Sequence, residues 1–210
     1  MSGLRLVGLT PSESLLLPLD LQIPPGALLL LSGPSGSGKS RLLRAIADLD
    51  PHGGEVWLDG QACSQWTAPD WRKQVGLLPA ESHWWSDLVG THFPRSPLPW
   101  LAELGFDAEV LAWSVQRLST GERQRLAIAR MLTLQPKALL LDEPTANLDP
   151  VNGRRVEQLI ETYRQTRAAP VLWVSHDRQQ RERLAQGTAV QRWVIQDRRL
   201  VPEPEAAPCN

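Results

Sequence analysis

The sequence predicts an α/β fold with a mostly parallel sheet, and two observations carry this prediction. Short apolar runs at 27–32, 138–141 and 170–174 have the length of strands, and segments with apolar residues at helical spacing separate them. A strand that is apolar at every position suits a sheet covered on both faces, which is typical of parallel sheets. Strands and helices that alternate in this way indicate an α/β protein.

The expected elements follow in order along the chain. Strands are expected at 4–9, 15–23, 27–32, within 51–60, and at 75–78, 138–141 and 170–174. Helices are expected at 41–49, 121–134 and 151–167, and helical material is expected within 101–112. A Pro- and Trp-rich stretch runs from 79 to 100, and the Pro/Glu/Ala composition of 202–210 predicts a disordered tail.

Composition excludes several classes of protein. The chain has 210 residues, 42% of them apolar and 21% charged, with a net charge of −1, so one ordinary globular domain is expected and nucleic acid is not an expected partner. No apolar run approaches the ~18 residues that span a bilayer, and the N-terminus does not resemble a secretory signal, so we expect a cytosolic protein. Cys63 and Cys209 predict no disulfide framework.

A glycine-rich octapeptide, GPSGSGKS, lies between the strand at 27–32 and the helix at 41–49. Backbone N–H groups in such a loop surround nucleotide phosphates, Lys39 reaches the β- and γ-phosphates, and the Ser40 hydroxyl ligates Mg²⁺. A plain glycine turn accounts for the glycines but leaves Lys-Ser unexplained. The predicted phosphate-binding residues are therefore Gly33, Pro34, Ser35, Gly36, Ser37, Gly38, Lys39 and Ser40.

Two acids follow the apolar run at 138–141. They emerge at the carboxyl end of a predicted strand, where open α/β sheets bind ligands. From this position Asp142 can hold Mg²⁺ through water, and Glu143 can orient and polarise an attacking water.

Three further motifs complete the pattern: LSTGERQR at 118–125, EPTANLD at 143–149 and VSHD at 174–177. Together with the phosphate loop, their order resembles the ATP-binding cassette (ABC) ATPases across nearly the whole chain. The resemblance implies a P-loop NTPase fold with a RecA-like core, N-terminal antiparallel strands and a short helical subdomain. It implies a single domain at 1–201, with the core at 1–79 and 126–201 and the helical subdomain at about 80–125.

The resemblance also implies residue roles in a homodimer that encloses two ATP molecules. Ser119 and Gly121 of the signature, with Glu122 beside them, would face the γ-phosphate held by the opposite chain. Asp149 would lie near the dimer seam, and His176 would touch the γ-phosphate and help to hold the attacking water. Each motif also has a simpler interpretation: a helix N-cap at 119–121, a turn at 149–150 and a core histidine at 176.

Several positions depart from the family pattern. Thr120 replaces the usual second glycine, Glu122 the common glutamine, and Arg41 the hydroxyl residue that usually follows the magnesium serine. No aromatic precedes Trp57, so the aromatic residue that stacks on adenine in the family, expected near position 11, is missing.

The segment PAESHWW at 79–85 departs most strongly. Ala80 stands where the family has a glutamine that senses the magnesium site, and Glu81 is the nearest polar substitute, which gives the hypothesis that Glu81 approaches Mg²⁺. Aromatic residues follow in the predicted helical subdomain, where they would form either a docking groove for a membrane subunit or the subdomain's own core: Trp84, Trp85, Phe93 and Trp100.

We therefore predict an ATP-hydrolysing subunit of an ABC transporter that uses ATP and Mg²⁺ and dimerises at the inner face of the membrane. Its expected partner is an integral membrane subunit on a separate chain. The alternatives are a soluble ABC ATPase in DNA repair, chromosome maintenance or translation, and a small-molecule kinase, which leaves the signature and His176 unexplained. The sequence does not identify the cargo, and a similarity to cassettes linked to metal export, including iron, is a weak analogy.

Overall fold

The computed structural model describes residues 3–12, 14–93 and 100–203. One sheet contains β1 (Leu4–Pro11), β2 (Leu19–Ile23), β4 (His52–Leu58) and β5 (Gln61–Ala62). The larger sheet contains β3 (Leu28–Ser32), β6 (Val75–Leu78), β7 (Ala138–Asp142), β8 (Val171–Val174), β9 (Val190–Gln196) and β10 (Arg199–Pro202).

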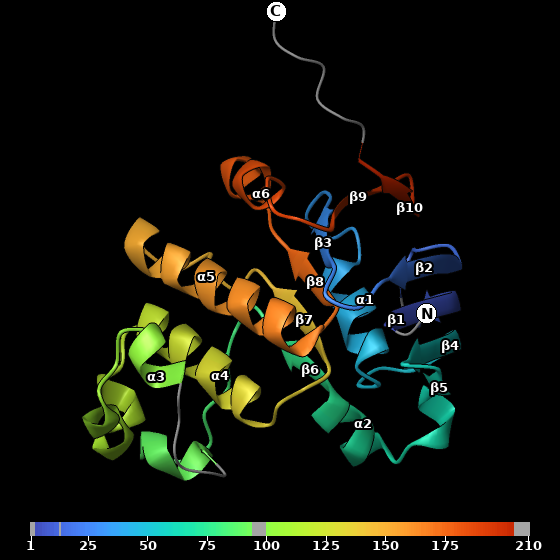
Figure 1. The fold of residues 1–210 in the computed structure, drawn as a ribbon. Helices are drawn as coiled ribbons and strands as arrows, with labels where there is room; N and C mark the ends of the chain where they lie inside the picture. Colours follow the sequence, from blue (N-terminus) through green and yellow to red (C-terminus); the bar gives the residue numbers. More distant parts are fainter. Residues whose placement is uncertain (1–2, 13, 94–99, 204–210) are drawn as a thin grey trace, which may run out of the picture.

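Helices lie on both faces of the large sheet, with α1 between the two sheets (Figure 1). They are α1 (Lys39–Ile46), α2 (Ala68–Gln74), α3 (Trp100–Glu103), α4 (Thr120–Thr133), α5 (Pro150–Arg167) and α6 (Arg178–Leu184), with the 3₁₀ helices η1 (Cys63–Gln65), η2 (Val89–His92), η3 (Ala108–Ala112) and η4 (Val115–Arg117). No helix in the described part of the chain has the length and apolar character needed to cross a bilayer.

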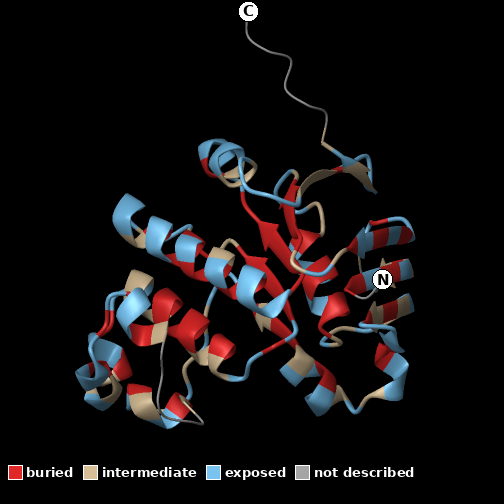
Figure 2. Cartoon of the chain, viewed as in Figure 1, coloured by how far each residue is buried: buried red, intermediate tan, exposed pale blue. Residues whose placement is uncertain are grey.

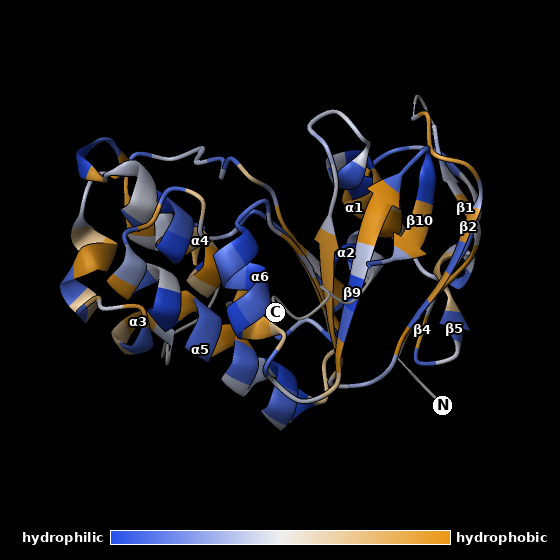
Figure 3. Ribbon diagram, turned by 90° about the horizontal axis from the view of Figure 1, so that it is seen from above, coloured by the Kyte–Doolittle hydropathy of each residue, from blue (hydrophilic) through white to orange (hydrophobic). Residues whose placement is uncertain are grey.

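The order of the strands confirms the predicted α/β fold. The small sheet is antiparallel and runs β2-β1-β4-β5. The large sheet runs β10-β9-β3-β8-β7-β6. The strands β9, β3, β8, β7 and β6 are parallel to one another, and β10 pairs antiparallel with β9. Seen from above, α3, α4 and α5 lie on one side of the large sheet and α1 with the small sheet on the other (Figure 3).

Two hydrophobic cores explain why the central strands are apolar at every position. In β3, Leu28 and Leu30 pack into the core that contains residues of α4 and α5, whereas Leu29 and Leu31 pack into the core shared with α1 and the small sheet. Successive side chains of a strand point to opposite faces, so each face needs its own apolar residues. The buried strands form the centre of the molecule in Figure 2.

Two predicted elements differ from the structure. The strand predicted at 15–23 begins only at Leu19, because the Leu17 N–H donates to the Arg198 carbonyl at 2.9 Å and holds this segment against the β9–β10 turn. The helical material predicted within 101–112 is present but interrupted: α3 ends at Glu103, Gly105 follows with φ 80°, and η3 begins at Ala108. A left-handed glycine of this kind ends a helix.

The sequence analysis did not predict α2, α6, β9 or β10. The sequence does mark the start of α2 with Thr67, a residue type that favours helix N-caps. In the structure the Thr67 side chain accepts from the Asp70 N–H at 3.3 Å and caps the helix. The predicted boundary at 125 falls inside α4, and the division into core and subdomain stays a prediction. Of the predicted tail, Pro202 ends β10, and 204–210 lie outside the described residues.

Candidate nucleotide site

The phosphate loop joins β3 to α1, as the sequence predicts. Gly36 and Gly38 have φ values of 75° and 99°, which L-residues with a side chain rarely adopt. A Cβ at Gly38 would also lie 2.9 Å from the Ser14 hydroxyl. The loop therefore requires glycine at 38 for both its backbone conformation and its packing, and α1 begins directly behind it with Lys39 as its first residue.

The Lys39 side chain folds back over this loop. Its ammonium donates to the carbonyls of Gly33 at 2.9 Å and Pro34 at 2.8 Å, and the residue is only 6% exposed. Burial lowers the pKa of Lys39, while the nearby charges of Glu143 and Asp142 act in the opposite direction. A partly desolvated cation with carboxylates close by is suited to the phosphates and metal of a nucleotide, since those charges complement it.

A cleft of about 450 Å³ opens beside the loop. Its lining brings together residues from three predicted motifs: Ser35, Gly36, Gly38, Lys39 and Ser40 of the phosphate loop, Glu143 after β7, and His176 after β8. Asp142, the last residue of β7, is 6% exposed and contributes to the electrostatic field at Lys39. The order β3-β8-β7 explains this convergence, because parallel strands bring their carboxyl ends to one edge.

Glu143 and His176 contact each other at that edge. The Glu143 Oε1 lies 3.1 Å from His176 Nε2, so a proton on Nε2 is donated to the carboxylate. Glu143 has φ 48°, and its N–H donates to the Val174 carbonyl at 3.2 Å. This unusual backbone conformation turns the Glu143 side chain away from the strand and towards the cleft.

Behind this pair lies a buried polar network that the sequence analysis missed. Gln180, the first buried residue of α6, donates to Thr145 Oγ1 at 2.7 Å and to Glu157 Oε1 at 2.8 Å, and accepts from Ser175 Oγ at 2.7 Å. Arg183 pairs with the same Glu157 at 2.7 Å. The network ties the segments after β7 and β8 to α5 and α6 and so fixes the positions of Glu143 and His176. No local pattern marks Gln180, because its partners lie far apart in the sequence.

The signature forms the start of α4. The Ser119 hydroxyl and N–H both donate to Glu122 Oε2 at 2.8 Å, and the Glu122 N–H donates back to the hydroxyl at 3.3 Å. These bonds form a capping box, as the simpler interpretation expects. The Ser119 backbone bond lowers the pKa of Glu122. A Cβ on Gly121 would lie 3.1 Å from the Asn147 carbonyl, which explains glycine at this position.

Asp149 caps α5. Its carboxylate accepts from the backbone N–H groups of Val151 and Asn152 at 2.9 and 3.0 Å, and these bonds lower its pKa. None of Ser119, Gly121, Glu122 and Asp149 is among the described residues that line the cleft. Their role across a dimer stays a prediction, and within one chain they cap helices.

Glu81 is exposed and does not line the cleft among the described residues. The position of Glu81 therefore does not support the hypothesis that this residue binds the metal. The aromatic residues of the predicted groove lie at two different places. The rings of Trp84 and Trp85 lie against His92, with centroids 4.7 and 4.4 Å away, whereas the ring of Trp100 packs on that of Tyr163 at 5.8 Å. Phe93 is partly buried against the core.

The donor set fits Mg²⁺ bound together with a nucleotide. The described residues contain no group of three or more His, Cys, Asp or Glu that could hold a metal ion by themselves. Mg²⁺ is usually held by one or two protein oxygens together with substrate phosphates. Ser40 beside the cleft and Asp142 at the strand end supply such oxygens. Among the described residues that line the cleft there is no Phe, Tyr or Trp, and Leu15, 72% exposed, supplies an apolar side chain.

A family model described as "ABC transporter" matches residues 16–146. Protein STAR1 of Oryza sativa subsp. japonica is 36% identical over 186 residues, covering 82% of this chain and 54% of that protein. The aliphatic sulfonates import ATP-binding protein SsuB 2 of Agrobacterium fabrum is 38% identical over 169 residues, covering 76% and 63%. The chain thus spans 54% and 63% of the lengths of these two relatives.

Two more comparisons extend this result. The probable iron export ATP-binding protein FetA of Escherichia coli is 33% identical over 173 residues, covering 76% of this chain and 77% of that protein. Relatives named for import and for export therefore match at similar identity. A bacterial Atm1-family ABC exporter with ATP bound superposes with a TM-score of 0.80 at 22% identity, over 95% of this chain and 38% of that one, and shows the P-loop NTPase fold. Since the family model covers more than half of the chain and the three relatives exceed 30% identity, the chain belongs to the ABC transporter family.

Proposed function

We propose that this chain binds and hydrolyses ATP and thereby drives a separate membrane subunit of an ABC transporter. One observation carries the proposal: Lys39 of the phosphate loop and the contacting pair Glu143 and His176 line the same cleft. Hydrolysis of a phosphoanhydride requires a cation that binds the phosphates and a carboxylate that positions water, both facing one space.

The residues of the cleft divide the work of hydrolysis. Lys39 and the N–H groups of the loop bind the phosphates and stabilise the charge of the transferring phosphoryl group. Ser40 and Asp142 would hold Mg²⁺, which neutralises charge on the β- and γ-oxygens when it is bound. Glu143 accepts a proton from the attacking water, and His176, 3.1 Å from that carboxylate, keeps it oriented.

A second copy of the chain completes each site in this proposal. Ser119 and Thr120 are exposed and the rest of the first turn of α4 is half-buried, so this turn can present a hydroxyl and a helix N-terminus to a γ-phosphate on another chain. Glu122 adds a negative charge beside that hydroxyl, which opposes binding of the phosphate. Two chains related by a twofold axis would enclose two equivalent ATP molecules, with Asp149 near their seam.

The proposed partner is an integral membrane protein, which places the chain at the cytoplasmic face of the cell membrane. The family and the names of relatives that contain "import" or "export" support this assignment. Cargo selection belongs to the partner in this scheme, since the cleft of this chain is built for phosphates.

The experiment measures phosphate release from Mg-ATP by the purified chain with no acceptor added. We expect release by the wild type and none by Lys39→Ala. Sedimentation of Glu143→Gln with Mg-ATP should give a dimer, and without nucleotide a monomer. Phosphate transfer only to an added small molecule would indicate a kinase, and a Glu143→Gln variant that stays monomeric with Mg-ATP would contradict the dimer.

A further inference from the structure

A pocket of about 410 Å³ lies beside the phosphate loop, where β9 turns into β10. We call it the β9–β10 pocket. Its lining comes from Leu15, from the phosphate loop (Pro34, Gly36 and Ser37) and from the end of β9 with the turn that follows (Val194, Ile195, Gln196, Asp197 and Arg198). Leu15 and Gly36 also line the nucleotide cleft, so the two spaces adjoin.

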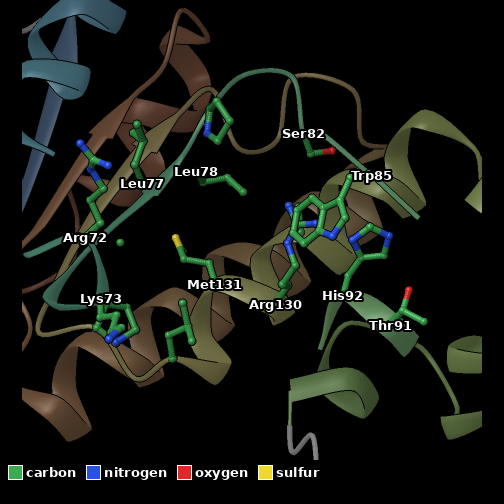
Figure 4. A pocket seen from close by; sticks show the side chains of 15 residues that line it. Arg72, Lys73, Leu77, Leu78, Ser82, Trp85, Thr91, His92, Arg130 and Met131 are labelled. Atoms are coloured by element: carbon green, nitrogen blue, oxygen red, sulfur yellow. The ribbon is translucent and has the colours of Figure 1, made fainter. Parts of the chain in front are cut away.

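Another cleft of the molecule does not adjoin the phosphate loop. Figure 4 shows this cleft between β6 and α4, where Leu77, Leu78 and Met131 face one space. It has a volume of about 440 Å³ and shares no lining residue with the nucleotide cleft. A nucleotide whose phosphates bind Lys39 therefore reaches the β9–β10 pocket directly, whereas the cleft at β6 is separate from its site.

The strand order places the β9–β10 pocket opposite the hydrolytic end of the site. β3, which leads into the phosphate loop, lies between β8 and β9, and all three strands are parallel. Glu143 and His176 follow β7 and β8, on one side of the loop, and the carboxyl end of β9 lies on the other side. Ligands of open α/β sheets bind along this edge. A nucleotide with its γ-phosphate near Glu143 thus has its base towards β9.

The chemistry of the β9–β10 pocket suits a flat ring system with polar edges. Leu15, Val194 and Ile195 give it apolar walls, and its charged residues are Asp197 and Arg198. A mainly apolar lining with a few polar groups is typical of small-molecule sites. The Ser37 Oγ is buried and has no hydrogen-bond partner among the described residues. Because buried polar atoms are normally paired, a ligand hydroxyl at this wall would supply a missing bond.

Arg198 is held at the junction of the pocket and the cleft in an unusual backbone conformation. It forms, with Asp197, the two-residue turn between β9 and β10, and the two residues have φ values of 64° and 50°. Glycine is favoured at the second position of such a turn. The Arg198 Nε donates to the Leu15 carbonyl at 2.6 Å, and the Arg198 carbonyl accepts from the Leu17 N–H at 2.9 Å. These bonds fix the guanidinium beside Leu15.

We propose that the β9–β10 pocket binds the base of the nucleotide and that the Arg198 guanidinium stacks on its ring. The proposal rests on the proposed function, because it assigns the base of the same ATP. A guanidinium is planar and stacks on nucleobases as an aromatic side chain does. The described residues that line the cleft and the pocket include no Phe, Tyr or Trp. Arg198 therefore supplies the flat surface, and Leu15 supplies an apolar contact beside it.

The test compares a ligand that has a base with one that lacks it. Calorimetric titration of the purified chain with Mg²⁺ measures the affinities for ADP and for pyrophosphate, neither of which leads to hydrolysis of ATP during the measurement. Arg198→Gly removes the guanidinium and introduces the residue that the turn favours, so the hairpin should fold. Arg199→Gln changes an exposed neighbour outside the pocket.

We expect Arg198→Gly to bind ADP about 5- to 30-fold more weakly than the wild type, as for the loss of a cation stacked on a ring. Its affinity for pyrophosphate should be unchanged, and Arg199→Gln should bind both ligands as the wild type does. Unchanged binding of ADP by Arg198→Gly would overturn the proposal. An equal loss of affinity for ADP and pyrophosphate would also overturn it, because Arg198 would then act on the phosphates.

Photolabelling of the wild type with 8-azido-ADP locates the base without any variant. The expected labelled peptide contains Leu15 or residues 194–198, and labelling confined to other peptides would overturn the proposal. Phosphate release from Mg-ATP separates this proposal from the proposed function. A chain that is labelled as expected but releases no phosphate would refute hydrolysis and leave the base pocket supported. A chain that releases phosphate while Arg198→Gly binds ADP normally would refute the base pocket alone.

Discussion

Replacing Glu143 by glutamine tests the role of this carboxylate most directly. Glutamine has the same length and can keep a hydrogen bond to His176 across the 3.1 Å that now separates the two side chains. It cannot accept a proton from water at neutral pH. The variant therefore removes the base and leaves the shape of the cleft almost unchanged.

The backbone at this position also tolerates the change. Glu143 has φ 48°, and the chain already places a glutamine in the same region at Gln135, with φ 53°. The Glu143 N–H keeps its bond to the Val174 carbonyl, since that bond does not involve the side chain. We expect the free energy of unfolding to change by less than about 0.5 kcal/mol, as for a substitution that removes no packing.

The expected loss of activity follows from the role of a general base. Such a group contributes about 10²- to 10⁴-fold, and each tenfold step is about 1.36 kcal/mol of activation free energy. The barrier should therefore rise by about 2.7–5.4 kcal/mol. The assay measures phosphate release at saturating Mg-ATP together with the affinity for ATP, which should be retained.

The matched control is Glu182→Gln, which changes an exposed glutamate that pairs with Arg178 on α6, away from the cleft. Its phosphate release should equal that of the wild type. A Glu143→Gln variant that keeps more than a tenth of the wild-type rate would refute the assignment of Glu143 as the base.

Three further predictions concern other parts of the chain. Burial raises the pKa of Cys63 to about 11. In a Cys209→Ser variant the Cys63 thiol should therefore resist alkylation at pH 8, where only about one in 1,000 molecules carries a thiolate. The contribution of this thiol to the free energy of unfolding is complete below about pH 8.5 and is lost as the pH rises towards 11. Leu15→Trp should tighten ATP binding, measured by titration, by about 2- to 12-fold, because an exposed ring could stack on the base. Gly121→Ala places a Cβ 3.1 Å from the Asn147 carbonyl and should lower phosphate release while ATP binding by the isolated chain is kept.

Each of these predictions has a control and a contradicting outcome. Rapid labelling of Cys63 in the native state would show that the thiol is not protected, and labelling after denaturation confirms that the reagent works. Leu15→Ala separates stacking from a simple change of the side chain, and equal affinities for the Trp and Ala variants would contradict a base contact. Thr120→Ala changes an exposed neighbour of Gly121; normal phosphate release by Gly121→Ala would contradict a role for the signature.

The sequence by itself was sufficient for the fold class and for the parts of the site that are local. A phosphate loop is built from consecutive residues, and its glycines and Lys39 can be read in order along the chain. Strands buried on both faces are apolar throughout, which made β3, β7 and β8 visible before the structure. The helical material predicted within 101–112 forms two short helices, α3 and η3, because Gly105 adopts φ 80° between them, and apolar spacing does not mark this interruption.

The tertiary structure decided what depends on distant segments. The 3.1 Å contact between Glu143 and His176 exists because β7 and β8 are neighbours in the sheet, an order that periodicity does not contain. The Gln180 network likewise joins side chains from separate elements. The tryptophans at 84 and 85 were ambiguous between core and surface until their contacts with Arg130 and His92 were known. Motifs made of consecutive residues can be recognised in the sequence, whereas contacts between distant segments depend on the arrangement of the whole chain.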